Sequence, residues 1–236
     1  RDRSACYEVA ESAGFVFNLA ADMSGMGFIE THKADCMISV LINTHMLMAA
    51  RRSKEQNITV FDKPVKKIVA VMQADEFKST WVANKAIYRT RMALADKGEL
   101  LIISPGLERF GEQPEVDAII RKYGYAGTQS VMEQYKKNDD LQDLAHAVAH
   151  LIHGSSEGRF TITYAPGKLS RKEIESVNFE YMDSHDALNR YSPEKMSEGW
   201  NKMPDGEKVY FISSPSAGLW AWKKKRIYKI KQYTDK

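Results

Sequence analysis

Residues Lys66–Ser104 read KKIVAVMQADEFKSTWVANKAIYRTRMALADKGELLIIS, and this stretch decides the fold. It contains two short apolar runs, Ile68–Met72 and Leu100–Ile103, which are unbroken rather than alternating. Unbroken apolar strands are typical of a parallel sheet that is covered on both faces. The residues between the runs predict a helix over Trp81–Ala95 that ends near Gly98. The stretch therefore predicts a right-handed strand–helix–strand crossover.

The helix of this unit carries two unlike faces. At about 100° per residue, one narrow stripe is suited to lie on the sheet and consists of Ala83, Ile87, Thr90 and Leu94. Lys85 falls opposite that stripe, and the residues around it are Trp81, Val82, Tyr88, Arg89 and Met92. An outward face is normally plainly polar, so two interpretations remain. Either long side chains cover a second packing surface, or the face meets a ligand or another domain, with Lys85 as an anion contact.

The composition is that of an ordinary soluble protein. The chain has 236 residues, of which 43% are hydrophobic and 28% charged, and its formal net charge is +3. That charge is too small to argue for a nucleic-acid partner, and no apolar run approaches the length that spans a bilayer. The two cysteines, Cys6 and Cys36, favour a reducing compartment over a disulfide framework. We therefore expect a cytoplasmic protein without a membrane partner.

Strands and helices alternate along the rest of the chain. Before the central unit, the pattern predicts helices over residues 2–12 and 37–51 and strands over residues 15–20 and 58–61. After it, the predicted helices span residues 114–123, 128–137, 139–153, 170–176 and 184–190, and the predicted strands span residues 160–164, 179–181 and 209–212. This order predicts a three-layer α/β/α sandwich around a Rossmann-like, mostly parallel sheet. We assign residues 1–219 to a single α/β domain and residues 220–236 to a basic C-terminal tail.

Two loops occupy places where the ligands of α/β proteins gather. Ser104–Glu112 is rich in turn residues and follows the strand at Leu100–Ile103, at the carboxyl edge of the predicted sheet. Ser213–Gly218 follows the strand at Val209–Ile212 and consists of small residues, as phosphate loops do. Its spacing matches neither GxGxxG nor GxxxxGKS/T, so a tight turn is the favoured interpretation.

Three histidines and a basic cluster offer further chemistry. His146, His150 and His153 lie at i, i+4 and i+7 of one predicted helix, a spacing at which two histidines can share a metal. They are accompanied neither by the glutamate of an HExxH motif nor by a cysteine or aspartate at a diagnostic offset, so no metal site is assigned. The Trp-flanked cluster Lys223–Arg226 is able to contact nucleic acid or an acidic surface, but charge runs near a terminus are usually solvated.

Four stretches, taken in order, resemble one known family. They are Gly14-Phe15-Val16-Phe17-Asn18 after the first helix, the helix entry Trp81-Val82-Ala83-Asn84-Lys85-Ala86, the strand and loop from Leu100 to Gly111, and the helix and strand from Asp140 to Tyr164. Together they are similar to the C-terminal half of the nickel-dependent lactate racemase family, over a region from about Asp2 to Gly218. The order and spacing of the motifs carry this resemblance, because each motif is short.

The resemblance implies a domain that closes over a substrate whose chemistry is supplied elsewhere. In that family two α/β domains enclose the site, and the N-terminal domain holds the catalytic histidines and the nickel-pincer nucleotide. The reaction moves the α-hydride of a 2-hydroxy acid to the cofactor and returns it to either face. Nothing in this sequence matches that N-terminal domain, and the chain begins at Arg1 rather than Met. We therefore expect no catalytic residue and no bound cofactor in this chain alone. The expected partners are a 2-hydroxy acid and the missing N-terminal domain of the same protein.

Residue by residue, the resemblance implies a substrate-binding set. Lys85 matches the family's substrate lysine and Trp81 its pocket aromatic, while Val82 stands where a glutamine is expected. Leu141 stands near the position of a pocket tryptophan, and Phe110 replaces a histidine of the preceding loop. A valine cannot form a hydrogen bond with a carboxylate or a hydroxyl group. The departures therefore point to a 2-hydroxy acid other than lactate, or to a member that has lost activity.

Two competing functions remain open. The first is a non-catalytic Rossmann-like module that binds a nucleotide or another small ligand at Ser104–Gly111 or Ser213–Gly218, and it rests on fold analogy. The second is an interaction protein whose basic, Trp-rich tail binds polyanions with a steep dependence on salt. Nucleic acid is the less favoured partner because the net charge is small.

Overall fold

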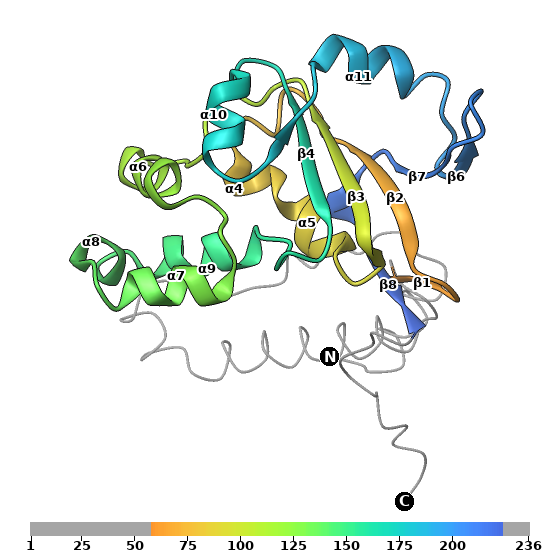
Figure 1. The fold of residues 1–236 in the computed structure, drawn as a ribbon. Helices are drawn as coiled ribbons and strands as arrows, with labels where there is room; N and C mark the ends of the chain where they lie inside the picture. Colours follow the sequence, from red (N-terminus) through yellow and green to blue (C-terminus); the bar gives the residue numbers. More distant parts are fainter. Residues whose placement is uncertain (1–57, 224–236) are drawn as a thin grey trace, which may run out of the picture. The chain divides into compact units, whose positions relative to one another are not determined.

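The computed structural model describes residues 58–223, which form an α/β fold around a central sheet (Figure 1). The helices and strands predicted before residue 58, both cysteines and residues 224–236 of the predicted tail lie outside the described residues. Within residues 58–223, no helix combines the length and the apolar character that crossing a membrane requires.

Within the described part of the chain, the central sheet has six strands in the order β5-β4-β3-β2-β7-β6. Their bounds are β2 Val65–Val71, β3 Leu94–Ser104, β4 Thr161–Pro166, β5 Glu180–Tyr181, β6 Gly199–Lys202 and β7 Lys208–Ile212. The pairs from β5 to β7 are parallel, and β6 runs antiparallel to β7. The predicted mostly parallel, Rossmann-like sheet is therefore confirmed. Strand β6 has no counterpart in the prediction, because four residues at an edge are too few for a periodic pattern.

Two apolar clusters cover the two faces of this sheet. Ile68 of β2 belongs to one cluster and the adjacent Val69 to the other, because successive side chains of a strand point to opposite faces. The first face is covered by α4 (Thr80–Ala83) and α5 (Lys85–Thr90), and the second by α11 (Ser184–Arg190). This arrangement confirms the three-layer α/β/α sandwich. It also explains why the central strands are apolar without alternation.

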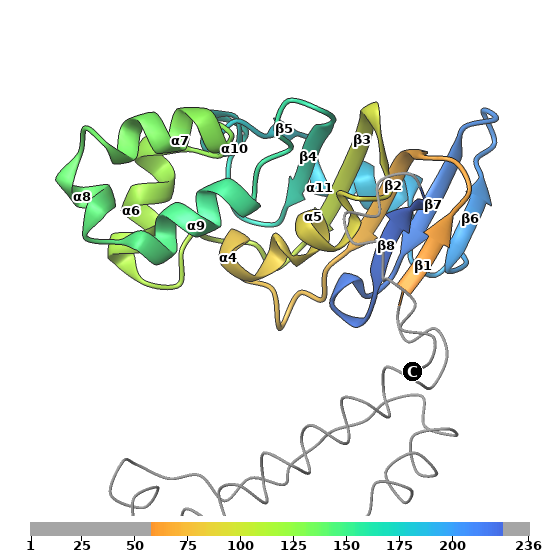
Figure 2. The same ribbon diagram turned by 90° about the horizontal axis from the view of Figure 1, so that it is seen from below.

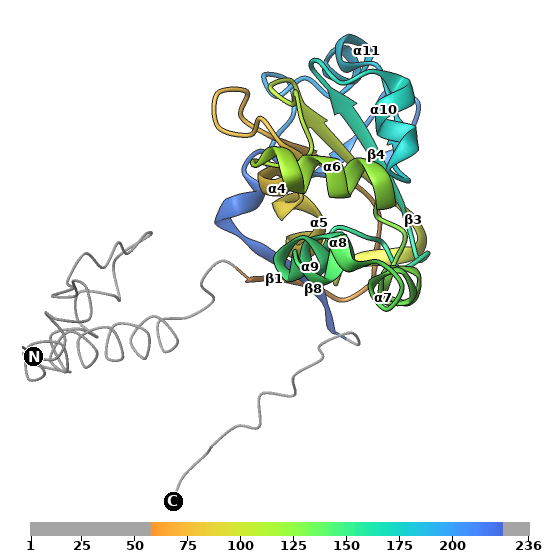
Figure 3. The same ribbon diagram turned by 90° about the vertical axis from the view of Figure 1, so that its left-hand side faces the viewer.

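Further helices extend the first layer beside α4 and α5 (Figure 3). They are α6 Pro114–Tyr123, α7 Thr128–Tyr135, α8 Asp139–Gln142, α9 Ala145–His153 and α10 Arg171–Ser176. The prediction of a single helix over residues 139–153 is wrong, because the chain forms two helices there. The backbone of Leu144 leaves the helical region (φ -121°, ψ 56°) and separates α8 from α9. Helix α10 begins with a capping box in which the Ser170 amide donates to the Glu173 carboxylate (2.9 Å).

The crossover helix after β2 is shorter than the sequence predicts. Instead of one helix over residues 81–95, the chain forms α4 and α5 with Asn84 between them, and β3 already begins at Leu94. Two residues after α5 ends, the chain makes a tertiary contact. The amide of Trp222 donates a hydrogen bond to the Met92 carbonyl oxygen (3.0 Å). Gly98 does not stop the helix but lies buried inside β3, where a Cβ would come within 2.7 Å of a backbone oxygen of β2.

A two-stranded sheet lies beside the central one (Figure 2). It pairs β1 (Ile58–Phe61) in parallel with β8 (Leu219–Trp222). The Phe61 ring meets the Tyr210 ring of β7 edge to face, with the ring centroids 4.8 Å apart. Residues 220–222, which the sequence assigned to the tail, therefore belong to a strand. A segment of this length has too short a pattern to be predicted as a strand. It forms one because it pairs with β1, at the other end of the described chain.

Candidate functional site

The loops at the carboxyl edge of the sheet interlock. The loop after β3 packs against the loops after β2 and β4, and two glycines make these close approaches possible. A Cβ on Gly106 would lie 2.0 Å from the carbonyl oxygen of Ala74, and a Cβ on Gly167 would lie 1.7 Å from that of Pro105. Any side chain at either position would displace backbone. The loop over residues 104–111 is therefore held firmly on both sides.

Helix α4 begins on this loop. The Trp81 amide donates to the Phe110 carbonyl oxygen (2.9 Å), which satisfies one of the donors that a helix start leaves unpaired. The Glu112 carboxylate accepts a hydrogen bond from the Ser79 hydroxyl and pairs with Arg109 (2.8 Å). These two contacts, the Ser79 bond first, hold the pKa of Glu112 below its ordinary value. The loop after β3 thereby fixes the position of α4.

The helical faces after β2 are those that the sequence predicts. The inner stripe is fully buried and consists of Ala83, Ile87, Thr90 and Leu94. Trp81, Val82 and Lys85 each keep part of their surface exposed, so the structure places three of the four proposed substrate-binding residues on one exposed helical segment. The fourth, Leu141, has an exposed fraction of 0% in the core cluster. The structure therefore places Leu141 in the core and not at the surface.

The Lys85 ammonium group lies over an aromatic ring. Its Nζ is 5.5 Å from the centroid of Phe77, a buried residue of the loop after β2. The ion pairs formed within residues 58–223 do not include Lys85. Within the described chain, this cation thus faces an aromatic ring rather than a carboxylate. Its charge remains available to an anion.

Trp81 packs against helix α9, whereas Lys85 lies over Phe77. Its ring stacks on the His150 ring, with centroids 4.3 Å apart and planes inclined by 33°, and it meets the His146 ring edge-on at 5.9 Å. Val82 packs against the core cluster beside it. The Trp81 ring is therefore held in a defined orientation while part of its surface stays exposed.

A buried set of polar side chains continues from the His150 ring, and we call it the Tyr125 cluster. Its members are Thr80, Asn84, Tyr125, His150 and Tyr164, all of them buried. The Tyr125 hydroxyl lies 2.8 Å from the Thr80 hydroxyl and 2.9 Å from His150 Nε2, and the Tyr164 hydroxyl donates to Asn84 Oδ1 (2.7 Å). The cluster links α4 to α9 and β4. It therefore sets the distance between Trp81 and the helix on which it stacks.

The number of available protons gives the direction of the hydrogen bond between Thr80 and Tyr125. The Thr80 hydroxyl donates to the Phe110 carbonyl oxygen (2.9 Å), so it accepts from Tyr125. His150 Nε2 lies within hydrogen-bond distance of both the Tyr125 hydroxyl (2.9 Å) and the Asn84 side-chain amide nitrogen (3.4 Å). Burial, together with the nearby charge of His153, lowers the pKa of His150 from 6.5 to about 4. The ring is therefore neutral at pH 7 in the folded protein.

The three histidines of α9 have different surroundings. His150 is buried, whereas His146 and His153 are exposed. Their ring nitrogens do not come together within 4.8 Å as a group of three. His146 and His150 therefore pack against Trp81 and do not form a three-histidine metal site.

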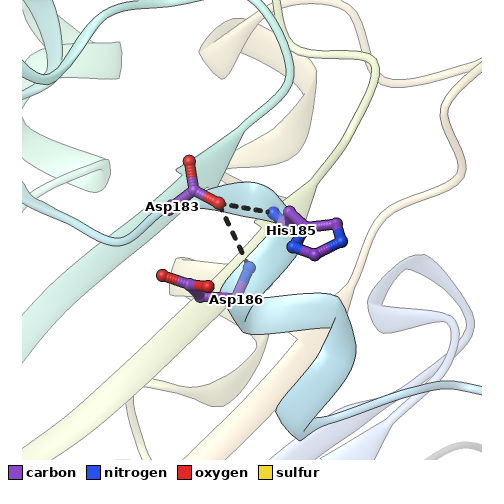
Figure 4. Close-up of side chains that lie close together, drawn as sticks. All are labelled: Asp183, His185 and Asp186. Carbon is purple, nitrogen blue, oxygen red and sulfur yellow. Dashed lines mark hydrogen bonds between the residues drawn. The ribbon is translucent and has the colours of Figure 1, made fainter.

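One group of three possible metal ligands does converge within the described residues. It consists of Asp183, His185 and Asp186 at the start of α11, all exposed (Figure 4). The Asp183 carboxylate accepts hydrogen bonds from the amides of His185 (2.9 Å) and Asp186 (3.1 Å). These are the bonds of an N-terminal helix cap. The group is therefore explained by the start of the helix, on the face of the sheet opposite to Trp81 and Lys85.

Sequence reasoning missed two residues on which the site depends. Phe77, which lies under the Lys85 ammonium group, is an aromatic residue in the otherwise polar loop QADEFKS. Tyr125, which joins Thr80 to His150, stands between Gly124 and Gly127. An apolar residue inside a polar loop and an aromatic residue between glycines are both signals of close packing, although neither indicates the partner.

Comparison with known proteins gives a local match in sequence. No family model matches the chain. A curated relative, GDP-mannose 3,5-epimerase 1 of Oryza sativa subsp. indica, is 49% identical over 47 residues, which are 20% of this chain and 12% of that enzyme. A match of this extent does not assign the chain to the family of that enzyme.

Two solved structures share the fold. A protein from Thermotoga maritima superposes with a TM-score of 0.59 at 21% identity, covering 78% of this chain and 43% of that one. The lactate racemase apoprotein from Thermoanaerobacterium thermosaccharolyticum superposes with a TM-score of 0.53 at 10% identity, covering 76% of this chain and 40% of that one. The chain spans less than half the length of either structure. At these identities the likeness shows that the chain has the fold of part of a lactate racemase.

Proposed function

We propose that this chain supplies the substrate-closing domain of a racemase or epimerase that acts on a 2-hydroxy acid. The fold that it shares with part of the lactate racemase apoprotein supports the proposal. The observation that carries it is Lys85, a partly exposed cation that faces Phe77 and forms no ion pair within the described residues. A positioned lysine in this state suits the carboxylate of a 2-hydroxy acid.

The neighbours of Lys85 suggest which part of the substrate each would contact. Lys85 would bind the carboxylate, while Trp81 and Val82 would line the apolar end of the substrate. Trp81 is suited to this role because its stacking on His150 fixes the ring before any substrate arrives. Val82 stands where the resembling family has a glutamine, and a valine side chain cannot form a hydrogen bond with the substrate. The proposed substrate is therefore a 2-hydroxy acid with an apolar side chain that is larger than that of lactate.

The proposal assigns the nickel-pincer nucleotide to an N-terminal domain that works together with this one. The described residues around Lys85 do not fit that cofactor, because Nε2 of the buried His150 is already in a hydrogen bond with Tyr125. His146 contacts the edge of Trp81 from an exposed position. We therefore assign no hydride-transfer step to any residue of this chain. Its residues would bind the substrate, orient it and exclude water.

The substitution Lys85→Ala in the complete protein, assembled with its nickel-pincer cofactor, tests this proposal. Loss of a charged hydrogen bond costs about 1.5–3 kcal/mol, so kcat/KM for 2-hydroxy acids is expected to fall about 10–100-fold. Circular dichroism and thermal unfolding should stay unchanged. Lys172→Ala, which removes a cation from the distant helix α10, is the matched control and should leave activity intact. Unchanged turnover in Lys85→Ala would overturn the assignment.

A second candidate function is a nucleotide-binding module. The local identity with a rice enzyme named for GDP-mannose favours it. Calorimetric titration of the full chain with GDP-mannose tests this candidate, because a substrate-closing domain is not expected to bind a nucleotide at the loops Ser104–Gly111 or Ser213–Gly218. Absence of binding heat would remove this second candidate and leave the first untouched.

A further inference from the structure

The edge of the central sheet carries a surface that neither candidate function uses. Strands β6 and β7 pair antiparallel, with Trp200 opposite Tyr210 and Lys202 opposite Lys208. Directly opposite residues of an antiparallel pair share a face, and so do residues two apart along a strand. These four side chains therefore project from one side of the β6–β7 hairpin, which we call the hairpin face.

The hairpin face has a hollow of the size of a small-molecule site. Its volume is about 430 Å³, and it is lined by Trp200, Asn201, Lys202 and Lys208. Sites for small ligands typically measure about 300–1,000 Å³. Trp200 is 56% exposed, which is the largest exposed fraction among the large apolar side chains of residues 58–223. A hollow bordered by an exposed indole and two cations has the chemistry of a ligand site.

Neither lysine of the hairpin face is paired with a carboxylate of the described part of the chain. The ion pairs formed within residues 58–223 include neither Lys202 nor Lys208. Like charges directly opposite each other on neighbouring strands repel. Lysines often protect an edge strand from pairing with another sheet, which accounts for Lys202 on β6. Lys208 is the first residue of β7, outside the stretch Tyr210–Ile212 that pairs with β2, and it lies opposite Lys202 across the hairpin. An anion between the two ammonium groups would relieve the repulsion.

The Trp200 ring is held in place although it is exposed. It meets the Phe61 ring at 6.0 Å and the Tyr210 ring at 5.3 Å, both in edge-to-face geometry. These contacts fix the orientation of the indole, and more than half of its surface remains open. An indole in this state can stack with a flat ring of a ligand.

The opposite side of the hairpin is anchored, so the hairpin face is formed in advance. Glu207 precedes Lys208 and therefore points to the other side. Its carboxylate accepts hydrogen bonds from Arg190 (2.9 Å) and Tyr191 (2.9 Å) and pairs with Lys67 (3.1 Å). The Met203 amide closes the turn by donating to the Glu207 carbonyl oxygen (2.8 Å). A rigid hairpin loses little conformational entropy when a ligand binds.

We propose that the hairpin face binds a small organic anion with a flat ring, of the nucleoside monophosphate class. The phosphate lies between Lys202 and Lys208, and the base stacks on Trp200. A hollow of this volume beside a four-residue edge strand favours such a compound over an extended polymer.

Calorimetric titration of the full chain with adenosine 5′-monophosphate (AMP) tests this inference. AMP is expected to bind more tightly than adenosine or inorganic phosphate, because it engages both the indole and the lysines. The double substitution Lys202→Gln/Lys208→Gln removes two charged contacts and is expected to weaken AMP binding at least about tenfold. The matched control Lys136→Gln/Lys137→Gln removes the same charge just after the end of α7 and is expected to leave AMP binding unchanged.

Three results would overturn the inference. They are no AMP binding up to about 10 mM, equal weakening by the control pair, and AMP binding that survives Lys202→Gln/Lys208→Gln. Binding of a longer oligonucleotide without binding of AMP also contradicts it, because the surface would then recognise a polyanion. Circular dichroism of both double variants verifies that they are folded. Loss of activity in Lys85→Ala is independent of all these outcomes. GDP-mannose binding that survives Lys202→Gln/Lys208→Gln belongs to the loops and not to the hairpin face, so the proposals fail separately.

Discussion

The lowered pKa of the buried His150 leads us to expect that the stability of this protein depends on pH. Burial lowers the pKa of the ring to about 4, against 6.5 for an ordinary histidine. Between pH 6.5 and 4, the unfolded chain therefore binds a proton at this ring that the folded chain does not bind, and acidification favours unfolding. The stability that the neutral ring provides is fully present above pH 6.5. It is lost progressively as the pH falls, and the loss is complete below about pH 4.

The magnitude follows from the two pKa values. At pH 5 the unfolded ring is almost fully protonated while the folded ring is still largely neutral. At about 1.4 kcal/mol per pKa unit, the free energy of unfolding is then about 2 kcal/mol lower than at pH 7.5. Below pH 4 the loss levels off at about 3 kcal/mol. Carboxylates such as Glu112, whose pKa lies below 4.5, contribute mainly at lower pH, so the interval from pH 7.5 to 5 isolates the histidine.

Urea unfolding of the full chain at pH 7.5 and pH 5, followed by far-UV circular dichroism, measures this effect. Tryptophan fluorescence is less suitable, because Trp81 stacks on His150 and would respond to its protonation directly. His150→Gln keeps a side chain that can form a hydrogen bond with Tyr125 and removes the titration, so the loss of stability between the two pH values should shrink by about 2 kcal/mol. His146→Gln is the matched control, since solvent reaches His146 in the folded and unfolded states. Equal losses in the unsubstituted protein and in His150→Gln would refute the reasoning.

Two further predictions concern packing. Leu141 is fully buried, so Leu141→Ala is expected to lower the free energy of unfolding in urea by about 2–5 kcal/mol; a loss below about 0.5 kcal/mol would show that this side chain is not part of the core. A Cβ at Gly167 would lie 1.7 Å from the carbonyl oxygen of Pro105, so Gly167→Ala is expected to cost at least about 1–3 kcal/mol. Thermal unfolding measures this cost against Lys172→Ala, and equal melting temperatures would contradict the close packing of the two loops.

The sequence by itself determined the architecture around β2 and β3. Runs of apolar residues without alternation are compatible with strands that are covered on both faces, and the sheet confirms this for Ile68–Val71 and Leu100–Ile103. Helical periodicity correctly separated the buried stripe of α4 and α5 from the exposed side that carries Trp81 and Lys85. These features depend on local geometry, since the direction of a side chain along a helix or strand follows from its position in the chain.

The boundaries of elements and the partners of side chains were decided by the tertiary structure. The crossover helix ends at Thr90 rather than Ala95, and the chain beyond it meets β8, more than a hundred residues later in the sequence. Leu141 lies in the core, and the helix predicted over its segment is divided at Leu144. His150 lies at the spacing of a metal ligand, but its ring forms a hydrogen bond with Tyr125 and stacks on Trp81.

The hairpin face is the clearest case of a feature that only the tertiary structure reveals. Trp200 and Lys202 lie in a segment without a recognisable strand pattern, and nothing in the sequence places them opposite Tyr210 and Lys208. Periodicity records which side of an element a residue occupies, because each element has a fixed rotation per residue. It does not record which element packs on that side. That choice is made by long-range pairing, and here it brings two cations and an indole around one hollow.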